Sequence, residues 1–216
     1  NSSASIVLHL AAKADVDGCE KDKEEDNRIL KLPDLKQQER EWVAKKTAWG
    51  VNVFGTKNIV DACLETNKKL IYISTDFVFD GTNPPAGGYS EENIANPINW
   101  YAKTKYEGEK IVQDLKIPWI IVRIAYPYRA NFGRFDFARA ILSRLRKGEK
   151  TPAVIDYIFT PTFIDDISFA LDTLIKKEAR GIYHAVGSQS LNPYEAAMII
   201  ANIFNCDNSL ISKTTG

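Results

Sequence analysis

The residues best suited to chemistry lie in two neighbouring segments of the sequence. The apolar run at residues 70–73 ends in Ser74 and Thr75, and a predicted helix begins near Tyr101 and carries Lys105 one turn later. A hydroxyl, a phenol and an ammonium placed in this way can converge on one carbonyl oxygen. Such a set suits the reduction of a carbonyl by a nicotinamide, in which the phenol gives a proton to the oxygen as hydride arrives at carbon.

The Tyr-x-x-x-Lys spacing is a weak signal by itself, because it arises about once by chance in a chain of this composition. It occurs twice here, as Tyr101 with Lys105 and as Tyr106 with Lys110. Tyr106 is turned by about 140° around the helix from Tyr101, so only one of the two pairs can face Thr75. We favour Tyr101 with Lys105, because Tyr101 opens its helix on the side that faces the strand ends. We expect Tyr106 to be a packed aromatic residue with its hydroxyl in solvent. Lys105 is expected to lower the pKa of Tyr101 by favouring the phenolate.

The composition argues against several other classes of function. Lys+Arg 28 against Asp+Glu 28 leaves no net charge, which gives no support to a nucleic-acid partner or an anionic membrane. The three cysteines have no metal-ligand or redox spacing, and the two histidines, His9 and His184, lie far apart in the sequence. We therefore expect no metal site and a reducing, cytoplasmic location. No apolar run approaches the roughly 20 residues that a membrane helix needs.

The elements that must position these residues alternate between strand and helix. Apolar runs predict strands at 5–10, 70–74, 119–124 and 181–186. Helical spacing and capping signals predict helices at 51–64, 100–115, 135–145 and from 192. Residues 160–175 are predicted to form a short extended piece that leads into a further helix. A polar helical stretch from about 19 to 50 should break at Pro33, and its mixed-charge run at 20–26 is interpreted as a solvated helix end.

This alternation predicts an α/β fold with a doubly wound, Rossmann-like parallel sheet. Ligands of such sheets bind at the carboxyl ends of the strands. Three predicted strands end there in small or hydroxylated residues, namely Ala11, Ala12, Ser74, Thr75, Ala125 and Tyr126. We expect a partial Rossmann-like core over residues 1–127 and a mixed C-terminal part, with elements of a small substrate lobe, over 128–216.

These motifs resemble the extended short-chain dehydrogenase/reductases, and within them the dTDP-4-dehydrorhamnose reductases. Residues 74–81 match the hallmark Ser-Thr-Asp-Tyr-Val-Phe-Asp-Gly, with Phe77 in place of Tyr. The resemblance continues through residues 89–92, 96–110, Arg123, 161–166 and 181–184, and so covers nearly the whole chain. An eight-residue block followed by the Tyr–Lys helix is a specific signal.

The resemblance implies an activity and a site. The activity is the NAD(P)H-dependent reduction of the 4-keto group of a nucleotide-linked deoxysugar, with NADP or NAD as cofactor. Assembly as a homodimer is possible under this resemblance. The residues implied as catalytic are Thr75, Tyr101 and Lys105. Those implied at the cofactor are Ala11, Ala12, Lys13, Asn52, Tyr101 and Lys105. Those implied near the sugar are Asp76 and Tyr126.

Several alternatives stay open beside this interpretation. Thr75 can be a strand-end hydroxyl that caps a turn, and Asn52 can be a buried residue that ties a helix to a strand. The chain also resembles the regulatory beta subunit of methionine adenosyltransferase, notably at residues 80–85, which implies a binding partner without turnover. A nucleotide-sugar epimerase or dehydratase uses the same Tyr–Lys pair, and dehydratases generally carry an acidic residue where Asp76 stands.

The chain departs from the family pattern at two points. None of its 12 glycines forms the Gly-x-x-Gly-x-x-Gly turn that cradles a pyrophosphate at a helix N-terminus. We expect that turn, and the first strands of the sheet, to precede Asn1 in a longer protein. The interval from Ala12 to Asn52 is longer than the family's and is expected to hold an extra helix around residues 30–46. We interpret that helix as solvated rather than as a lid or a subunit contact.

Overall fold

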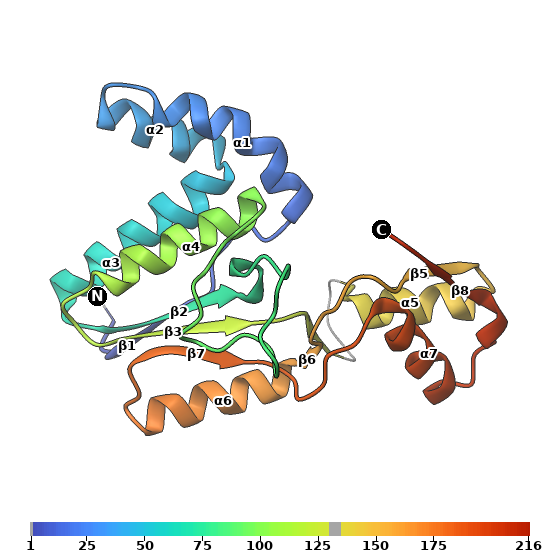
Figure 1. The fold of residues 1–216 in the computed structure, drawn as a ribbon. Helices are drawn as coiled ribbons and strands as arrows, with labels where there is room; N and C mark the ends of the chain where they lie inside the picture. The colour runs from blue at the N-terminus through green and yellow to red at the C-terminus, as the bar shows by residue number, and fades with distance from the viewer. Residues whose placement is uncertain (1, 130–134) are drawn as a thin grey trace. The chain divides into compact units, whose positions relative to one another are not determined.

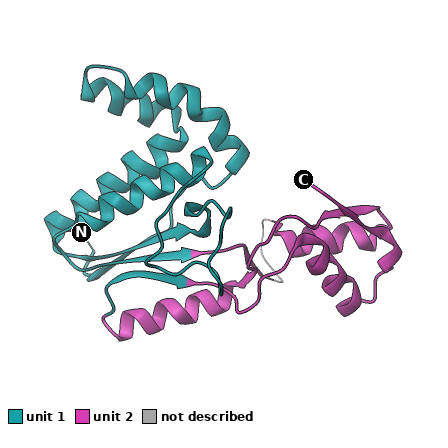
Figure 2. Cartoon of the chain, in the orientation of Figure 1, with its two compact units in different colours: residues 1–123, 179–184 teal, residues 124–178, 185–216 magenta. Residues whose placement is uncertain are grey.

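The chain forms two compact units, described in a computed structural model that covers residues 2–129 and 135–216. Unit 1 comprises residues 1–123 and 179–184, and unit 2 comprises residues 124–178 and 185–216 (Figure 2). The sequence-based boundary at residue 127 lies close to the first of these divisions. Residues 179–184 return to unit 1 because the strand they enter joins its sheet.

A four-stranded sheet forms the centre of unit 1. Its strands, in spatial order, are β1 (Ile6–His9), β2 (Lys69–Thr75), β3 (Trp119–Ile124) and β7 (Gly181–Ala185). β1 and β2 pair in parallel, and the arrows of β2, β3 and β7 point the same way in Figure 1. The predicted parallel sheet is therefore confirmed.

The helices of unit 1 lie between these strands in the sequence, close to the predicted positions. They are α1 (Val16–Leu30), α2 (Leu35–Lys45), the π-helix η1 (Gly50–Phe54), α3 (Gly55–Thr66), the 3-10 helix η2 (Asp76–Val78) and α4 (Trp100–Gln113). The expected break at Pro33 is confirmed, and α2 is the extra helix. α4 begins where the Asn99 side chain accepts the N–H of Ala102 at 2.8 Å.

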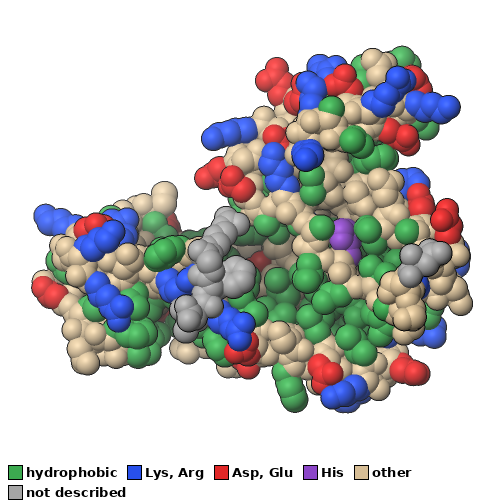
Figure 3. All heavy atoms as spheres, turned by 180° about the vertical axis from the view of Figure 1, so that it is seen from behind, with side chains coloured by type: hydrophobic (Ala, Val, Ile, Leu, Met, Phe, Trp, Pro, Cys, Tyr) green, Lys and Arg blue, Asp and Glu red, His purple; other side chains and the backbone are tan. Residues whose placement is uncertain are grey.

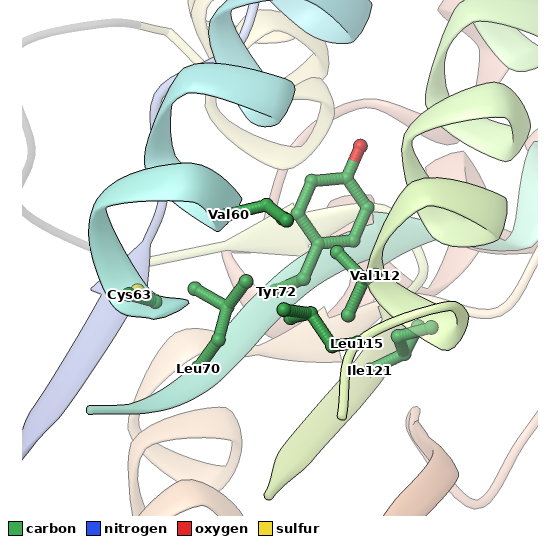
Figure 4. Close-up of a cluster of buried hydrophobic side chains, with 7 residues drawn as sticks. All are labelled: Val60, Cys63, Leu70, Tyr72, Val112, Leu115 and Ile121. Carbon is green, nitrogen blue, oxygen red and sulfur yellow. The ribbon is translucent and has the colours of Figure 1, made fainter. Parts of the chain in front are cut away.

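The hydrophobic core of unit 1 lies between the sheet and the helices α3 and α4, which cover one of its faces (Figure 1). Figure 4 shows its buried members, which are Val60, Cys63, Leu70, Tyr72, Val112, Leu115 and Ile121. Burying a large side chain of this kind contributes about 1.5–3 kcal/mol. This core fixes α4 on β2.

The described residues of unit 2 form two short parallel strand pairs and three α-helices. β4 (Pro127–Tyr128) pairs with β6 (Thr162–Phe163), and β5 (Thr151–Val154) pairs with β8 (Ile211–Thr214). The helices are α5 (Phe137–Arg146), α6 (Ile164–Lys176) and α7 (Pro193–Ile203), with the 3-10 helix η3 at Asn208–Leu210. The predicted start of α7 is confirmed by a capping box between Asn192 and Glu195.

Apolar side chains also reach the surface. Figure 3 shows a face on which hydrophobic side chains gather, with charged side chains around their border. Leu8 in β1 and Leu10 just after it are 41% and 65% exposed. Within the described residues β1 has a strand neighbour on one side only. None of the helices in that part of the chain has the length and apolarity that a membrane span requires.

Two glycines test the packing of α4 on β2. A Cβ at Gly108 in α4 would collide with the hydroxyl of Tyr72, whereas a Cβ at Gly55 in α3 would meet one backbone oxygen at an ordinary 3.6 Å. Gly108→Ala should therefore destabilise unit 1 by about 1–3 kcal/mol. Gly55→Ala should leave it unchanged or stabilise it by about 0.5–1 kcal/mol, because Gly lowers helix stability. Urea unfolding curves measure both, and equal effects at the two positions would contradict the packing described.

Candidate active site

Thr75 and Tyr101 lie close together where β2 ends and α4 begins, near enough for the Thr75 hydroxyl to influence the pKa of Tyr101. The hydroxyl of Thr75 also accepts the N–H of Phe77 at 3.2 Å and lies 3.2 Å from Oδ1 of Asp76. A threonine hydroxyl has one proton and two lone pairs, so it can serve both of these partners and still accept one more hydrogen bond. Thr75 therefore caps η2, as its structural interpretation requires, and also lies close to Tyr101. The catalytic role of both residues stays a prediction.

Burial dominates the electrostatics of the phenol and the nearby carboxyl group. It raises the pKa of Tyr101 to about 12, and the charge of Asp76 adds to the increase, while the hydrogen bond with Thr75 opposes it. Burial also raises the pKa of Asp76 to about 6, against the hydrogen bond from Thr75. The expectation that Lys105 lowers the pKa of Tyr101 is wrong, because desolvation of the phenol outweighs other influences. At neutral pH the phenol holds its proton, as an acid must.

Lys105 is buried beside aromatic groups. Its Nζ lies 4.0 Å from the centre of the Tyr72 ring, and its side chain is among the buried polar groups of unit 1. Burial lowers the pKa of Lys105 to about 7, although Glu109 acts in the opposite direction. His9 on β1 stays neutral, since burial and the charge of Lys105 lower its pKa to about 4. Near neutrality Lys105 can therefore hold or release a proton.

A buried ion pair lies one helical turn beyond Lys105. Arg123 of β3 binds Glu109 of α4 through two hydrogen bonds, with Nε to Oε1 at 3.0 Å and Nη2 to Oε2 at 2.7 Å. The guanidinium also lies 5.1 Å from the centre of the Phe79 ring. Removing one partner of a buried pair costs about 3–5 kcal/mol, because the other charge is left uncompensated. The pair thus ties α4 to β3. Sequence reasoning missed Glu109, although its spacing of one turn from Lys105 was available as a signal.

Asn52 holds the segment that follows β1. Its Oδ1 accepts the N–H of Lys13 at 2.8 Å, and its Nδ2 donates to the Lys13 carbonyl at 3.0 Å and to Thr104 Oγ1 at 2.9 Å. Both amide protons are thereby used within the protein. These bonds favour the structural interpretation of Asn52. Ala11 and Ala12, which precede Lys13, are exposed.

The remaining predicted residues make other contacts. Nζ of Lys110 is 4.8 Å from the centre of the Tyr106 ring and 2.8 Å from Glu107, on the exposed side of α4. Tyr126 belongs to unit 2, where its hydroxyl contacts that of Tyr157 and its ring packs at 4.8 Å on Phe159.

The buried ammonium predicts a pH dependence of stability. Lys105 binds its proton with a pKa of about 7 in the folded state and about 10.4 when unfolded. Between these values the unfolded chain holds more protons, so the stability of the wild type should rise with pH. Lys105→Met, which buries no ammonium, should melt at a higher temperature than the wild type at pH 7. This difference in melting temperature should shrink as the pH rises to 10. Lys110→Met, on the exposed side of the same helix, is the control. A difference for Lys105→Met that does not vary with pH would contradict this.

Comparisons with known proteins agree with this arrangement. A family model described as the RmlD substrate binding domain matches residues 35–215. The chain is 33% identical over 172 residues to methionine adenosyltransferase 2 subunit beta of Bos taurus, covering 76% of this chain and 51% of that protein. It is 31% identical to dTDP-4-dehydrorhamnose reductase of Aggregatibacter actinomycetemcomitans, over 71% of this chain and 53% of that protein. The chain thus spans about half the length of the curated relatives that it matches.

Solved structures share the fold. The dTDP-4-dehydrorhamnose reductase of Bacillus anthracis, in complex with NADP, is 29% identical with a TM-score of 0.80, over 98% of this chain and 66% of that one. The UDP-glucose 4-epimerase of Thermus thermophilus, in complex with NAD, is 18% identical with a TM-score of 0.76, over 98% of this chain and 65% of that one. At this low identity the similarity shows only that the two proteins share a fold. The family model matches residues 35–215, and the chain has a parallel sheet on which the helix with Tyr101 and Lys105 packs. The chain therefore belongs to the RmlD substrate-binding domain family.

Proposed function

We propose that this chain forms the catalytic part of a reductase that uses NADPH or NADH to reduce the 4-keto group of a nucleotide-linked deoxysugar. The observation that carries the proposal is the closeness of the phenol of Tyr101 to the hydroxyl of Thr75, with Lys105 one turn further along α4. The similarity to reductases of dTDP-4-dehydrorhamnose, one of them in complex with NADP, supports the substrate class and the cofactor.

Each of the three residues has a role in this reaction. Tyr101 donates its proton to the carbonyl oxygen, and burial, which raises its pKa to about 12, keeps that proton in place until then. Thr75 turns its hydroxyl proton from Asp76 to the same oxygen. Lys105, with a pKa of about 7, stabilises the phenolate that forms and can return a proton to it. The nicotinamide, when bound, supplies the hydride.

The residues around Lys105 fit the ribose end of a nicotinamide cofactor. The ammonium is buried against the Tyr72 ring and near the neutral His9, so a hydroxyl pair from a ligand would relieve its desolvation. The cofactor would be held by Tyr101, Lys105, the exposed Ala11 and Ala12, and the half-buried Lys13. Asn52 acts on it indirectly, by fixing the backbone of Lys13. The substrate would lie beside Asp76, and a role for Tyr126 near the sugar stays a prediction.

A second candidate function is that of a regulatory subunit. It is favoured by the 33% identity to methionine adenosyltransferase 2 subunit beta of Bos taurus. In that case the site residues would serve association or nucleotide binding without turnover. Assembly as a homodimer and a cytoplasmic location stay predictions for either function.

Replacing the phenol tests the reductase directly. In the whole protein that contains this chain, Tyr101→Phe should lower kcat by about 100-fold or more, the usual scale for loss of a positioned general acid. The KM for NADPH and the melting temperature should change little, since one hydroxyl is removed. Consumption of NADPH in the presence of a dTDP-4-keto-6-deoxy sugar is followed by absorbance.

Tyr106→Phe is the matched control, because it makes the same chemical change on the exposed side of α4 and should leave kcat unchanged. Turnover by Tyr101→Phe at the wild-type rate would show that the proton comes from another group. Absence of turnover by the wild type on every nucleotide sugar, together with capture of a methionine adenosyltransferase catalytic subunit, would favour the regulatory function.

A further inference from the structure

Carboxylates of α1 bind the first turn of α4. Oε2 of Glu20 accepts the backbone N–H of Trp100 at 2.8 Å, and Oδ2 of Asp26 accepts the indole N–H of the same residue at 2.8 Å. The first N–H groups of a helix have no partner within it. α1 thus supplies one of these missing acceptors and also holds the side chain of Trp100, the residue that immediately precedes Tyr101.

The same helix binds the segment that leads into η1. Oδ2 of Asp22 accepts the N–H of Ala48 at 2.7 Å, and Oδ2 of Asp26 accepts the N–H of Trp49 at 3.0 Å. The expectation that residues 20–26 form a solvated helix end is therefore wrong for Asp26, which is fully buried. A polar sequence could not show this, because the acceptors face donors from distant parts of the chain.

Trp100 is packed as well as hydrogen-bonded. It forms a buried cluster with Cys19 of α1 and Ala48, and Tyr101 and Trp49 pack against that cluster. The rings of Trp49 and Trp100 are 5.8 Å apart. A displacement of Trp100 would therefore move Tyr101, which is its neighbour in the chain and in the cluster.

Stability alone does not account for Asp26. Oδ1 of this buried carboxylate has no hydrogen-bond partner among the described residues, while Oδ2 accepts two N–H groups. Burying a polar oxygen without a hydrogen-bond partner is unfavourable, and apolar residues of similar volume are often at least as stable in such places. What the carboxylate adds is one defined position for the indole of Trp100.

α2 supports α1 from its outer side. Arg28 of α1 pairs with Glu41 of α2 at 2.9 Å, and Lys45 of α2 pairs with Glu25 of α1 at 2.6 Å. Nε2 of Gln38 donates to the carbonyl of Leu32 at 2.7 Å, which holds the turn between the two helices. Exposed ion pairs contribute little individually. α2 is also held by its buried Trp42, whose ring packs on Phe54 of η1.

We propose that α1 is a positioning element of the active site, in which Glu20 and Asp26 fix Trp100 and so hold Tyr101 against Thr75. The kinetic consequence rests on the proposed reductase function, whereas the structural consequence does not. Trp100→Phe removes the indole N–H but keeps an aromatic ring, and Asp26→Asn keeps the shape of the side chain. Glu24→Gln, an exposed position of the same helix, is the control.

Hydrogen exchange in the whole protein tests the structural part. Both Trp100→Phe and Asp26→Asn should raise the exchange rate of the peptide covering residues 99–104 by about 10-fold or more, while Glu24→Gln leaves it unchanged. Should Trp100→Phe fail to fold, Asp26→Asn decides the test. If both variants exchange at residues 99–104 as slowly as the wild type, the proposal is overturned, regardless of any result on enzyme activity.

A kinetic cycle tests the link to Tyr101. Trp100→Phe should lower kcat by about 10-fold at an unchanged KM for NADPH, but should cause no further loss in a Tyr101→Phe background, because coupled residues are non-additive. An equal loss in both backgrounds would overturn the positioning role. Faster exchange in a protein that turns over no nucleotide sugar would support the contact of α1 with α4 and overturn the proposed reductase function instead.

Discussion

The packing of α4 on β2 is the contact on which the other features of the site depend. The hydroxyl of Tyr72 in β2 donates to the carbonyl of Lys105 in α4 at 3.2 Å, and Gly108 lets the two elements approach. That approach brings Tyr101 to Thr75 at one end of the contact and places Lys105 over the Tyr72 ring. Since both elements are held by the core of unit 1, the geometry of the site is part of the fold rather than a property of loops.

Close packing also determines the charge states. Lys105 and the pair of Glu109 and Arg123 are held in a buried region, where each charge affects its neighbours more strongly than in water. Burial therefore lowers the pKa of Lys105 to about 7 and raises that of Tyr101 to about 12. The protonated phenol of Tyr101 can donate a proton, and the amine of Lys105, which titrates near neutrality, can replace it.

Much of the fold could be predicted from the sequence where the local signal was strong. β3 was placed at its observed bounds because residues 119–124 are apolar except for Arg123, and α7 was placed by its capping residues. β5 was missed because it contains Pro152, and β8 because it is short and mostly polar. The π-helix η1 depends on tertiary packing, in which Gly50 lies against Trp42. The pKa of Tyr101 was misjudged because the degree of burial is not visible in a sequence.

A crystal structure of the whole protein with NADP and a nucleotide-linked 4-keto sugar, or a stable analogue, would test the central claim most directly. The account predicts that the oxygen at C4 lies within about 2.6–3.2 Å of both Tyr101 Oη and Thr75 Oγ1, the range over which a proton can be transferred. A sugar bound with that oxygen out of reach of Tyr101, or facing Tyr106 on the other side of α4, would contradict it.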